Sequence, residues 1–196
     1  GHTRDDQAET VLLGLARGSG ARSLSGMAPI NGKVIRPLLN VTREVTEQAC
    51  KDLGCEVWND PHNFNQDFSR VRVRTQVLPM MEKELGPGIS DALARTASLL
   101  RDDADALDAL ADQAAAGLDL ADLDIDQLSK LPKAVRTRVL RRAIYAQGAP
   151  GGAITADHVS AVEALVTSWH GQGEVSLPGG VKVARISGRL SLYARS

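Results

Sequence analysis

The sequence predicts an α/β domain over residues 1–80, followed over residues 81–196 by a mostly α-helical domain that ends in β-hairpins. Helical patterns alternate with short strand-like runs in the first part, and the composition turns to alanine, leucine and aspartate after Pro79. Short alternating apolar runs separated by glycine follow near the end. With 196 residues, 43% of them hydrophobic and 3% aromatic, the chain can form one large or two small globular domains.

The first 80 residues contain two expected helices and two short strands. A helix is expected over about 5–17, before the Gly-Ser-Gly run at 18–20. A strand is expected at about 33–36, and a second helix runs from a threonine cap over 42–53 to a glycine stop. Residues 56–58 are strand-like and lead into a cluster of turn-forming residues.

A long helix is expected in the middle of the chain. Alanines and leucines recur there at spacings of four and three residues, which is typical of a helix that packs closely against a partner. These positions are Leu93, Ala97, Leu100, Ala104, Leu107 and Ala111.

Two further helices and the hairpins follow. A helix is expected over 132–147, with an apolar stripe that places its basic side chains together on the outer side. The stripe consists of Val135, Val139, Ala143 and Ala146. A helix over 156–169 is expected after a Thr155 cap, and the runs 174–177, 181–186 and 189–193 predict strands joined by glycine-containing turns.

Charge is strongly segregated although the formal net charge is only −1. Residues 82–126 contain twelve acids and three bases, whereas residues 130–142 contain six bases and no acid. The basic residues are Lys130, Lys133, Arg136, Arg138, Arg141 and Arg142. This pattern fits a surface for a polyanion and fits solvated helix faces equally well, so both interpretations stay open.

Composition excludes several classes of protein. No segment approaches the about 20 apolar residues that a membrane-spanning helix needs, and no signal-peptide core is present. Cys50 and Cys55 are the only cysteines, and their spacing fits neither a zinc site nor a CxxC redox motif. We therefore expect a cytoplasmic protein with reduced thiols, no protein-bound metal and no membrane partner.

The first ten residues carry the densest set of reactive side chains. A helix that starts at Asp5 places Asp6, Glu9 and Thr10 on one face, with His2 one turn earlier. Two carboxylates aimed at one point suit a substrate ammonium group, a magnesium ion on phosphates or a proton in acid–base chemistry. Acids in a first turn also cap helices, and spacing alone leaves that alternative open. Because the chain begins inside this cluster, we expect its working partners to lie upstream.

A series of motifs in the first 80 residues resembles one family. HTRDDQAET at 2–10, LARGSG at 15–20, LSGM at 24–27 and RPLL at 36–39 are followed by WNDPHN, FSRVRVR and LP, which end at Pro79. Their order and spacing resemble the tRNA(Ile)-lysidine synthetases. Beyond Pro79 the resemblance is weaker and rests on the order of helices, the basic helix and the terminal hairpins.

The resemblance implies a fold and an activity. The family is built on an N-type ATP pyrophosphatase (PP-loop) domain, so residues 1–80 are expected to form part of a doubly wound parallel sheet. Its members use ATP, with Mg²⁺, to adenylate the wobble cytidine of isoleucine tRNA with a CAU anticodon, and L-lysine then displaces AMP to give lysidine. The family's SGGxDS phosphate loop is absent from these residues. We therefore expect this chain alone to be inactive and to need an N-terminal half of the ATPase domain.

The resemblance also implies roles for single residues. Asp6 and Glu9, with His2, are expected to be catalytic, by binding the lysine ammonium group or removing a proton. Arg36, Arg70 and Arg74 are expected to bind the lysine carboxylate, ATP or tRNA phosphates, since guanidinium groups suit these anions. Structural salt bridges are the alternative for these arginines. The tRNA-binding residues are expected to be Lys130, Lys133, Arg136, Arg138, Arg141 and Arg142.

Two departures from the family pattern limit these roles. Thr3 stands where many members have a second histidine, and Val71 stands where asparagine is frequent. A non-catalytic tRNA-binding module and another PP-loop enzyme, such as a tRNA thiolase, remain alternatives, although thiolases usually carry CxxC motifs. The sequence is compatible with a homodimer.

Overall fold

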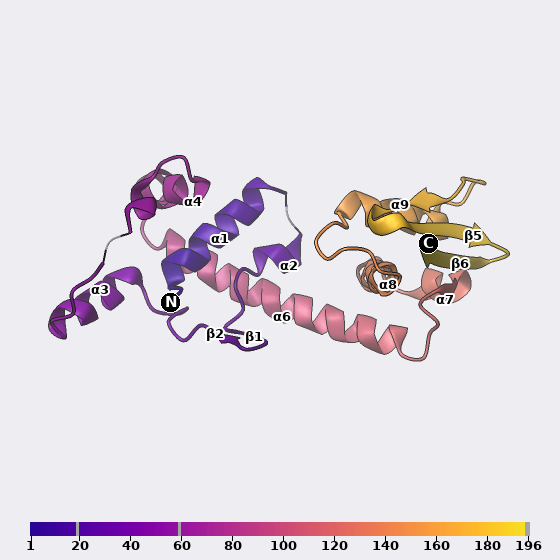
Figure 1. Cartoon of the computed structure of the whole chain (residues 1–196), viewed down its shortest axis with the longest axis horizontal. Coiled ribbons are helices and arrows are strands. Elements are labelled where there is room, and N and C mark those ends of the chain that lie inside the picture. The colour runs from indigo at the N-terminus through magenta and orange to yellow at the C-terminus, as the bar shows by residue number, and fades with distance from the viewer. Residues whose placement is uncertain (19, 59, 195–196) are drawn as a thin grey trace. The chain divides into compact units, whose positions relative to one another are not determined.

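The structure is a computed structural model that describes residues 1–18, 20–58 and 60–194 (Figure 1). It divides into two compact units, Gly1–Ala104 (unit 1) and Asp105–Ser196 (unit 2). The division falls inside the longest helix, α6 (Ile89–Ala115). Each unit has its own core and is described by itself.

Unit 1 is built mainly of helices. Before α6 its elements are α1 (Arg4–Ala16), α2 (Ala21–Leu24), β1 (Ile30–Asn31), β2 (Val34–Ile35), α3 (Arg43–Asp52), the 3-10 helix η1 (Pro61–Phe64), α4 (Ser69–Arg72), the π-helix η2 (Val73–Val77) and α5 (Leu78–Leu85). The two predicted helices are confirmed as α1 and α3, and the Thr42 hydroxyl caps α3 by accepting from the Val45 amide at 3.2 Å. The strand predicted at 56–58 is wrong, because these residues have no sheet partner.

The predicted doubly wound parallel sheet is not confirmed. Within residues 1–18, 20–58 and 60–194, every strand pairing is antiparallel. In unit 1 the only such pairing among the described residues joins β1 to β2 over two residues each. A parallel pair needs a crossover connection, usually a helix, between two strands of one sheet. The helices α1 and α3 are present, but the strands that they would connect are not among the described residues.

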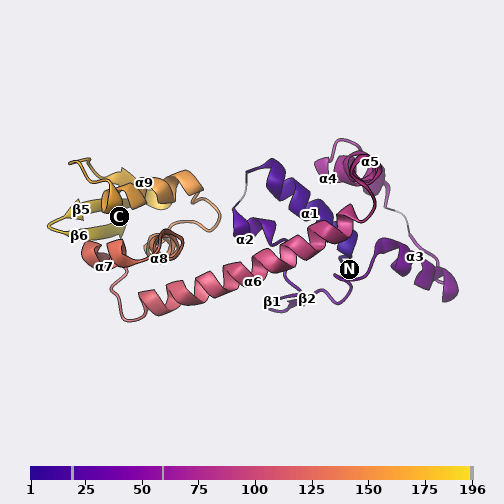
Figure 2. The same ribbon diagram turned by 180° about the vertical axis from the view of Figure 1, so that it is seen from behind.

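Helix α1 lies at the centre of unit 1. Figure 2 shows it beside α2 and the first part of α6. Its Ala8 is wholly buried against Val73 and Leu78, with Leu12 and Leu93 packed around them. The carbonyl oxygen of the Gln7 side chain accepts from the Met27 amide at 2.7 Å, and its amide group donates to the Met27 carbonyl at 3.0 Å. This pair of hydrogen bonds holds the loop after α2 against α1.

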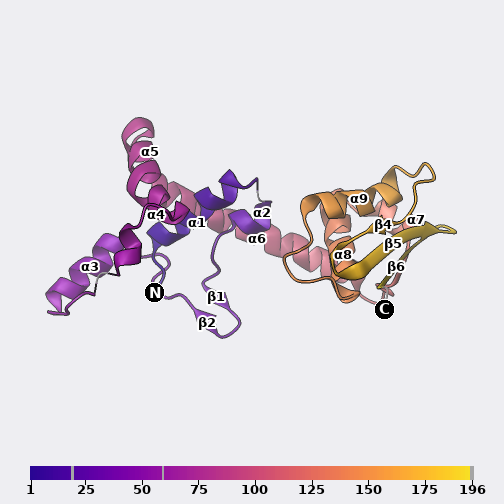
Figure 3. The same cartoon turned by 45° about the horizontal axis from the view of Figure 1, so that its top comes forward.

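Unit 2 combines three helices with one antiparallel sheet. Its elements after α6 are β3 (Asp122–Asp124), α7 (Ile125–Lys130), α8 (Lys133–Ala146), α9 (Ala156–Thr167), β4 (Val175–Ser176), the 3-10 turn η3 (Pro178–Gly180), β5 (Val181–Ile186) and β6 (Arg189–Ala194). The strand order is β3-β6-β5-β4, visible in Figure 3 for the last three strands. The three predicted C-terminal strands are confirmed, whereas β3 was not predicted.

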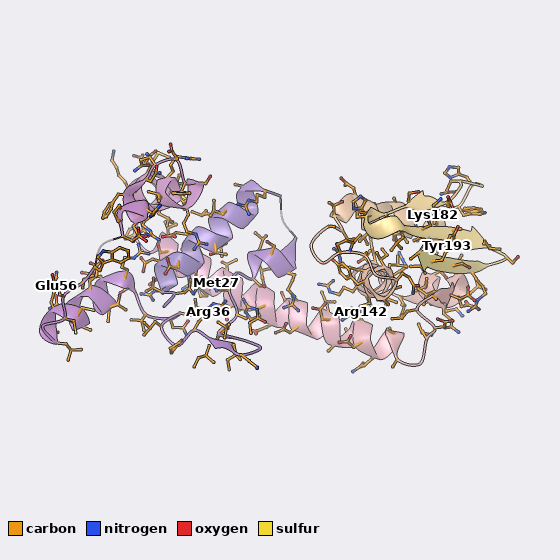
Figure 4. All side chains as sticks on the ribbon, viewed as in Figure 1. Met27, Arg36, Glu56, Arg142, Lys182 and Tyr193 are labelled. Atoms are coloured by element: carbon orange, nitrogen blue, oxygen red, sulfur yellow. The ribbon has the colours of Figure 1, made fainter. Side chains whose placement is uncertain are left out.

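The core of unit 2 lies between the helices and one face of the sheet. Val181 and Val183 of β5 and Leu190 and Leu192 of β6 alternate inward and join α8 and α9 in one cluster. The side chains between them face outward. There Lys182 and Tyr193 lie on adjacent strands in register (Figure 4), and both contact Glu174.

The predicted helices of the second half are confirmed with corrections. In α6, Ala97, Ala104 and Ala111 are almost fully buried, as the spacing predicted. In α8, Ala146 is exposed, and Leu140 and Ile144 are buried in its place. Among the described residues, none of the helices is both long enough and apolar enough to cross a membrane. α6 has the length, but its many aspartates make it too polar.

Candidate active site

The start of α1 is fixed by its own acidic residues. The Asp6 carboxylate accepts from the Thr3 amide at 2.8 Å and from the Thr3 hydroxyl at 3.0 Å. The Asp5 carboxylate accepts from the Arg43 amide at 2.7 Å, which ties the first turn of α3 to that of α1. Asp6 therefore fits both interpretations of the sequence, helix capping and a charged site. One of its oxygens caps the helix, and the other faces arginines.

Glu9 is wholly buried and is held by arginines from three other helices, α3, α4 and η2. Arg74 of η2 forms a bidentate pair with it, from Nε to Oε1 at 2.6 Å and from Nη2 to Oε2 at 3.0 Å. Arg43 Nη2 lies 3.6 Å from Oε1, and Arg70 Nε lies 3.8 Å from Oε2. The second oxygen of Asp6 joins this cluster, at 3.1 Å from Arg43 and 3.2 Å from Arg74. We call these five residues the carboxylate–arginine cluster.

The cluster keeps Asp6 ionised. Burial raises the pKa of the Asp6 carboxyl, but the hydrogen bonds from Thr3 and the charges of Arg43 and Arg74 outweigh it, so the pKa lies below its ordinary value. The hydrogen bond to Glu9 raises the pKa of Arg74 above that of a free guanidinium group, against the opposing effect of burial. A carboxylate with a lowered pKa is a weak base, so Asp6 is better suited to hold a cation than to remove a proton.

Two clefts lie beside the cluster, and Arg43 and Arg74 line both. The larger, of about 430 Å³, is also lined by Asp6, Trp58 and Phe64. The smaller, of about 240 Å³, is lined by acidic residues from α1 and α5 and by Ser90. Both clefts offer carboxylates and guanidinium groups together, which is the combination that a zwitterionic amino acid needs.

The predicted residues of this region are only partly brought together. Asp6, Glu9, Arg70 and Arg74 meet in the cluster, as their shared role requires. His2 is exposed and is not among the residues that line the two clefts. Arg36 is directed elsewhere, because its Nη1 donates to the Ala28 carbonyl at 2.8 Å (Figure 4). The chemical roles predicted for these residues stay predictions.

Arg43 is the member of the cluster that sequence reasoning missed. It occupies the first position of α3, where a positive side chain is unfavourable to the helix dipole. A basic residue placed against the dipole, four positions after the RPLL run ends, is a signal that it is held there by acids. The arginines at 70 and 74 reach the cluster together because α4 and η2 are helical, and four-residue spacing puts them on one face.

The basic residues of α8 have unequal environments. The sequence placed Lys130, Lys133, Arg138 and Arg141 on the outer side. Arg136, which was also predicted to bind tRNA, is only 7% exposed and donates to Glu163 at 2.6 Å. Arg138 pairs with Asp108 at 2.8 Å, and Arg142 pairs with Asp112 at 2.7 Å (Figure 4). Arg141 donates to the Ile154 carbonyl at 2.8 Å. Most of these arginines therefore hold α8 to its neighbours.

Lys130 and Lys133 differ from those arginines. Both are exposed, at the end of α7 and the start of α8. Within the part of the chain that the structure describes, neither forms an ion pair. They are the two cations of the basic stretch that are available to an anionic partner.

Comparison with known proteins matches both parts of the chain to described families. Residues 1–81 match the model of a PP-loop domain, and residues 123–191 match that of the TilS substrate binding domain. The carboxylate–arginine cluster lies wholly within the first match. The basic helix α8 lies within the second.

Several curated relatives are similar over nearly the whole chain. A tRNA(Ile)-lysidine synthase of Thermobifida fusca is 55% identical over 196 residues, covering 99% of this chain and 60% of that protein. The Streptomyces coelicolor protein of the same name is 55% identical over 97% of this chain and 55% of its own length. That of Mycobacterium tuberculosis is 49% identical over 94% and 58%. The chain thus spans somewhat more than half the length of these relatives, and over that span it is similar to the tRNA(Ile)-lysidine synthases.

Proposed function

We propose that the chain is part of an ATP-dependent carbon–nitrogen ligase that attaches lysine to the wobble cytidine of isoleucine tRNA with a CAU anticodon. The observation that carries this proposal is the 55% identity over 196 residues to a tRNA(Ile)-lysidine synthase. The reaction would consume ATP to adenylate the cytidine C2 oxygen, and the lysine amine would then attack C2 and release AMP. A cytoplasmic location follows from the tRNA substrate and belongs to the same proposal.

The carboxylate–arginine cluster would hold the lysine. Asp6 faces the 430 Å³ cleft, and its lowered pKa suits the binding of an ammonium group. Arg43 and Arg74 line the same cleft and would receive the lysine carboxylate. Glu9 has no exposed surface, so we assign it the role of positioning the arginines. A lysine amine is mostly protonated near neutral pH, so a base must take its proton before attack, and Asp6 is poorly suited to that step.

The contacts to ATP would come largely from residues outside this sequence. The SGGxDS phosphate loop is not among the 196 residues, and we propose that it follows a strand of a parallel sheet contributed by another segment. Mg²⁺ would enter with the phosphates of ATP. A homodimer stays a prediction.

Unit 2 would bind the tRNA outside the anticodon. The match to a substrate binding domain supports this role, and Lys130 and Lys133 are the cations best placed for it. We propose domains at 1–80 and 81–196, which places α6 in the second domain. A non-catalytic tRNA-binding module remains the second candidate function for the isolated chain, because the substrate-binding match lies almost entirely within a separate compact unit.

The test is transfer of labelled lysine to an isoleucine tRNA transcript that carries a CAU anticodon, with ATP present. The chain is assayed alone and joined to the segment of the Thermobifida fusca relative that it does not cover. We expect the joined protein to transfer lysine and Asp6→Asn to reduce kcat/KM for lysine at least 100-fold. The matched control is Glu44→Gln, an exposed acid of α3. Full activity of Asp6→Asn would remove Asp6 from the lysine site, and no transfer by the joined protein would overturn the proposed function.

A further inference from the structure

A third cleft lies on unit 1, further along α1 toward its C-terminal end. It has a volume of about 420 Å³, within the range typical of small-ligand sites. Its floor is one helical stripe that includes Thr10, Gly14 and Arg17. One wall is Ser23 of α2, and the other is the segment from Phe68 to Arg70 at the start of α4.

The charge of this cleft differs from that of the two clefts beside the carboxylate–arginine cluster. Among the described residues that line it, Arg17 and Arg70 are the only ionisable ones, and none is a carboxylate. The Arg70 guanidinium group is fixed by two residues of α1. Its Nη2 donates to the Thr10 hydroxyl at 2.9 Å, and its Nε lies 3.8 Å from buried Glu9. Its side chain is still 41% exposed. A guanidinium group fixed on one edge and open on the other is preorganised for an anion.

The cleft also offers an aromatic surface and hydroxyl groups. Phe68 lines it and is 49% exposed, with the His62 ring tilted against it at a centroid distance of 6.3 Å. Ser23 and Ser69 add hydroxyl groups that can donate to phosphate or base oxygens. Exposed aromatic rings beside arginines are the means by which proteins stack the bases of single-stranded nucleic acids and hold their phosphates.

We propose that this cleft binds one nucleotide, with its phosphate between Arg17 and Arg70 and its base against Phe68. Its lining residues differ from those of the cleft proposed to hold lysine, but Arg70 belongs both to this site and to the carboxylate–arginine cluster, through its contact with Glu9. The ligand is a mononucleotide or one residue of a single-stranded RNA. The case in which the nucleotide belongs to an RNA strand rests on the proposed function, because a loop of the tRNA substrate would then be the strand that enters the cleft.

The experiment measures binding of a fluorescently labelled hexacytidylate RNA to the full chain by anisotropy. All proteins carry Lys130→Ala and Lys133→Ala, so that unit 2 contributes less to binding. Arg17→Ala is expected to weaken binding about tenfold and to reduce the salt dependence of log K by about 0.7, the loss of one single-strand phosphate contact. Phe68→Ala is expected to weaken it about tenfold through lost stacking. Phe68→Leu serves if circular dichroism shows that the alanine variant is unfolded.

The matched control is Arg95→Ala, an exposed arginine of unit 1 that does not line the cleft, and it should change binding less than twofold. Competition by unlabelled CMP or AMP at similar strength identifies a mononucleotide site, and competition only by RNA identifies a strand site. Inorganic phosphate competing as well as CMP would exclude base recognition and overturn the proposal. Equal effects of Arg95→Ala and Arg17→Ala, or no effect of Arg17→Ala and the Phe68 variants, would also overturn it.

The lysine-transfer assay separates this inference from the proposed function. Nucleotide binding that depends on Arg17 and Phe68, without lysine transfer by the joined protein, would support the nucleotide site and refute the proposed ligase function. Lysine transfer by the joined protein, together with unaltered RNA binding by the Arg17 and Phe68 variants, would support the ligase function and refute the nucleotide site.

Discussion

The two units of the chain are stabilised by different kinds of interaction. Unit 2 encloses one continuous apolar cluster that includes Leu140, Ile144 and Leu190, each fully buried. In unit 1 the cluster around α1 contains only Ala8, Val73 and Leu78 as buried members. Beside it lie buried Glu9 and its arginines. Unit 2 thus depends mainly on the hydrophobic effect, whereas unit 1 depends also on paired charges.

Exposed apolar side chains sharpen the contrast. Unit 1 exposes several large apolar side chains, among them Trp58 (79%), Leu53 (77%), Ile30 (69%) and Ile35 (68%). In unit 2 the large exposed apolar residues are few among those described, with Ile186 at 56% the most exposed. Unit 1, which contains the carboxylate–arginine cluster, thus has fewer buried apolar side chains in its core cluster than unit 2.

The largest expected effect comes from removing a charge of unit 1. Glu9→Gln places a neutral amide in the fully buried site and removes the charge that pairs with the half-buried Arg74, and we expect a loss of about 3–5 kcal/mol in the unfolding free energy of unit 1. Hydrogen-exchange mass spectrometry measures this as faster exchange in peptides of α1, with peptides of α8 unchanged. Glu44→Gln, an exposed acid, is the control. Unchanged exchange in α1 would show that unit 1 does not depend on the buried pair.

A substitution that creates a cavity in the core of unit 2 should lower the unfolding free energy of that unit by a similar amount. Leu140 is fully buried, so Leu140→Ala is expected to cost about 2–5 kcal/mol. Exchange in peptides of α8 and β5 should accelerate while α1 keeps its protection. Leu110→Ala, at a leucine that is 49% exposed, should change exchange little. Acceleration in α1 as well would show that the two units unfold together and would weaken the comparison.

The loop after α2 provides a smaller and more local test. Gly26 has φ +61°, and a Cβ atom there would lie 2.5 Å from the buried Gln7 side chain. We expect Gly26→Ala to destabilise unit 1 by about 1–3 kcal/mol, through backbone strain and loss of the hydrogen bonds from Gln7 to Met27. Gly18→Ala is the matched control, because Gly18 has φ +63° and open space around it. Urea denaturation followed by circular dichroism measures both, and equal losses would exclude a role for the contact with Gln7.

The smallest expected effect is the pH dependence that Asp6 adds to unit 1. Its pKa is lowered in the folded state, so its stabilisation is complete above the ordinary value of about 3.9 and is lost as the pH falls through the folded value. The difference in unfolding free energy between the parent and Asp6→Asn should therefore be constant from pH 5 to 7 and shrink below pH 4. Urea denaturation at each pH measures it. A difference that persists unchanged at pH 3 would contradict the low pKa.

The elements that sequence predicted well are those whose signals are local. The cap at Thr42, the turn glycines and the alternation of residues 181–186 and 189–193 fix short segments through their own geometry. β3 escaped prediction because Asp122–Asp124 has the composition of a loop and becomes a strand only by pairing with β6. Residues 56–58 show the reverse, since a strand-like composition without a partner forms no strand.

The candidate site divides in the same way. Sequence placed Asp6 and Glu9 on one face of a helix, and the family resemblance added Arg70 and Arg74. Arg43 was missed, and Arg36 was grouped with the others although it contacts the Ala28 carbonyl instead. Which guanidinium group meets which carboxylate depends on the packing of α3 and η2 against α1, which no local pattern encodes.

The sequence by itself determined the resemblance to the tRNA(Ile)-lysidine synthases, the order of most helices and the presence of two carboxylates at the start of α1. Only the tertiary structure decided that Glu9 is buried behind arginines, and that Arg136 supports unit 2 through Glu163. The physical reason is that helical periodicity and capping act over a few residues, whereas burial and ion pairing depend on segments far apart in the chain. A charged residue looks the same in sequence whether it faces a substrate or holds two helices together.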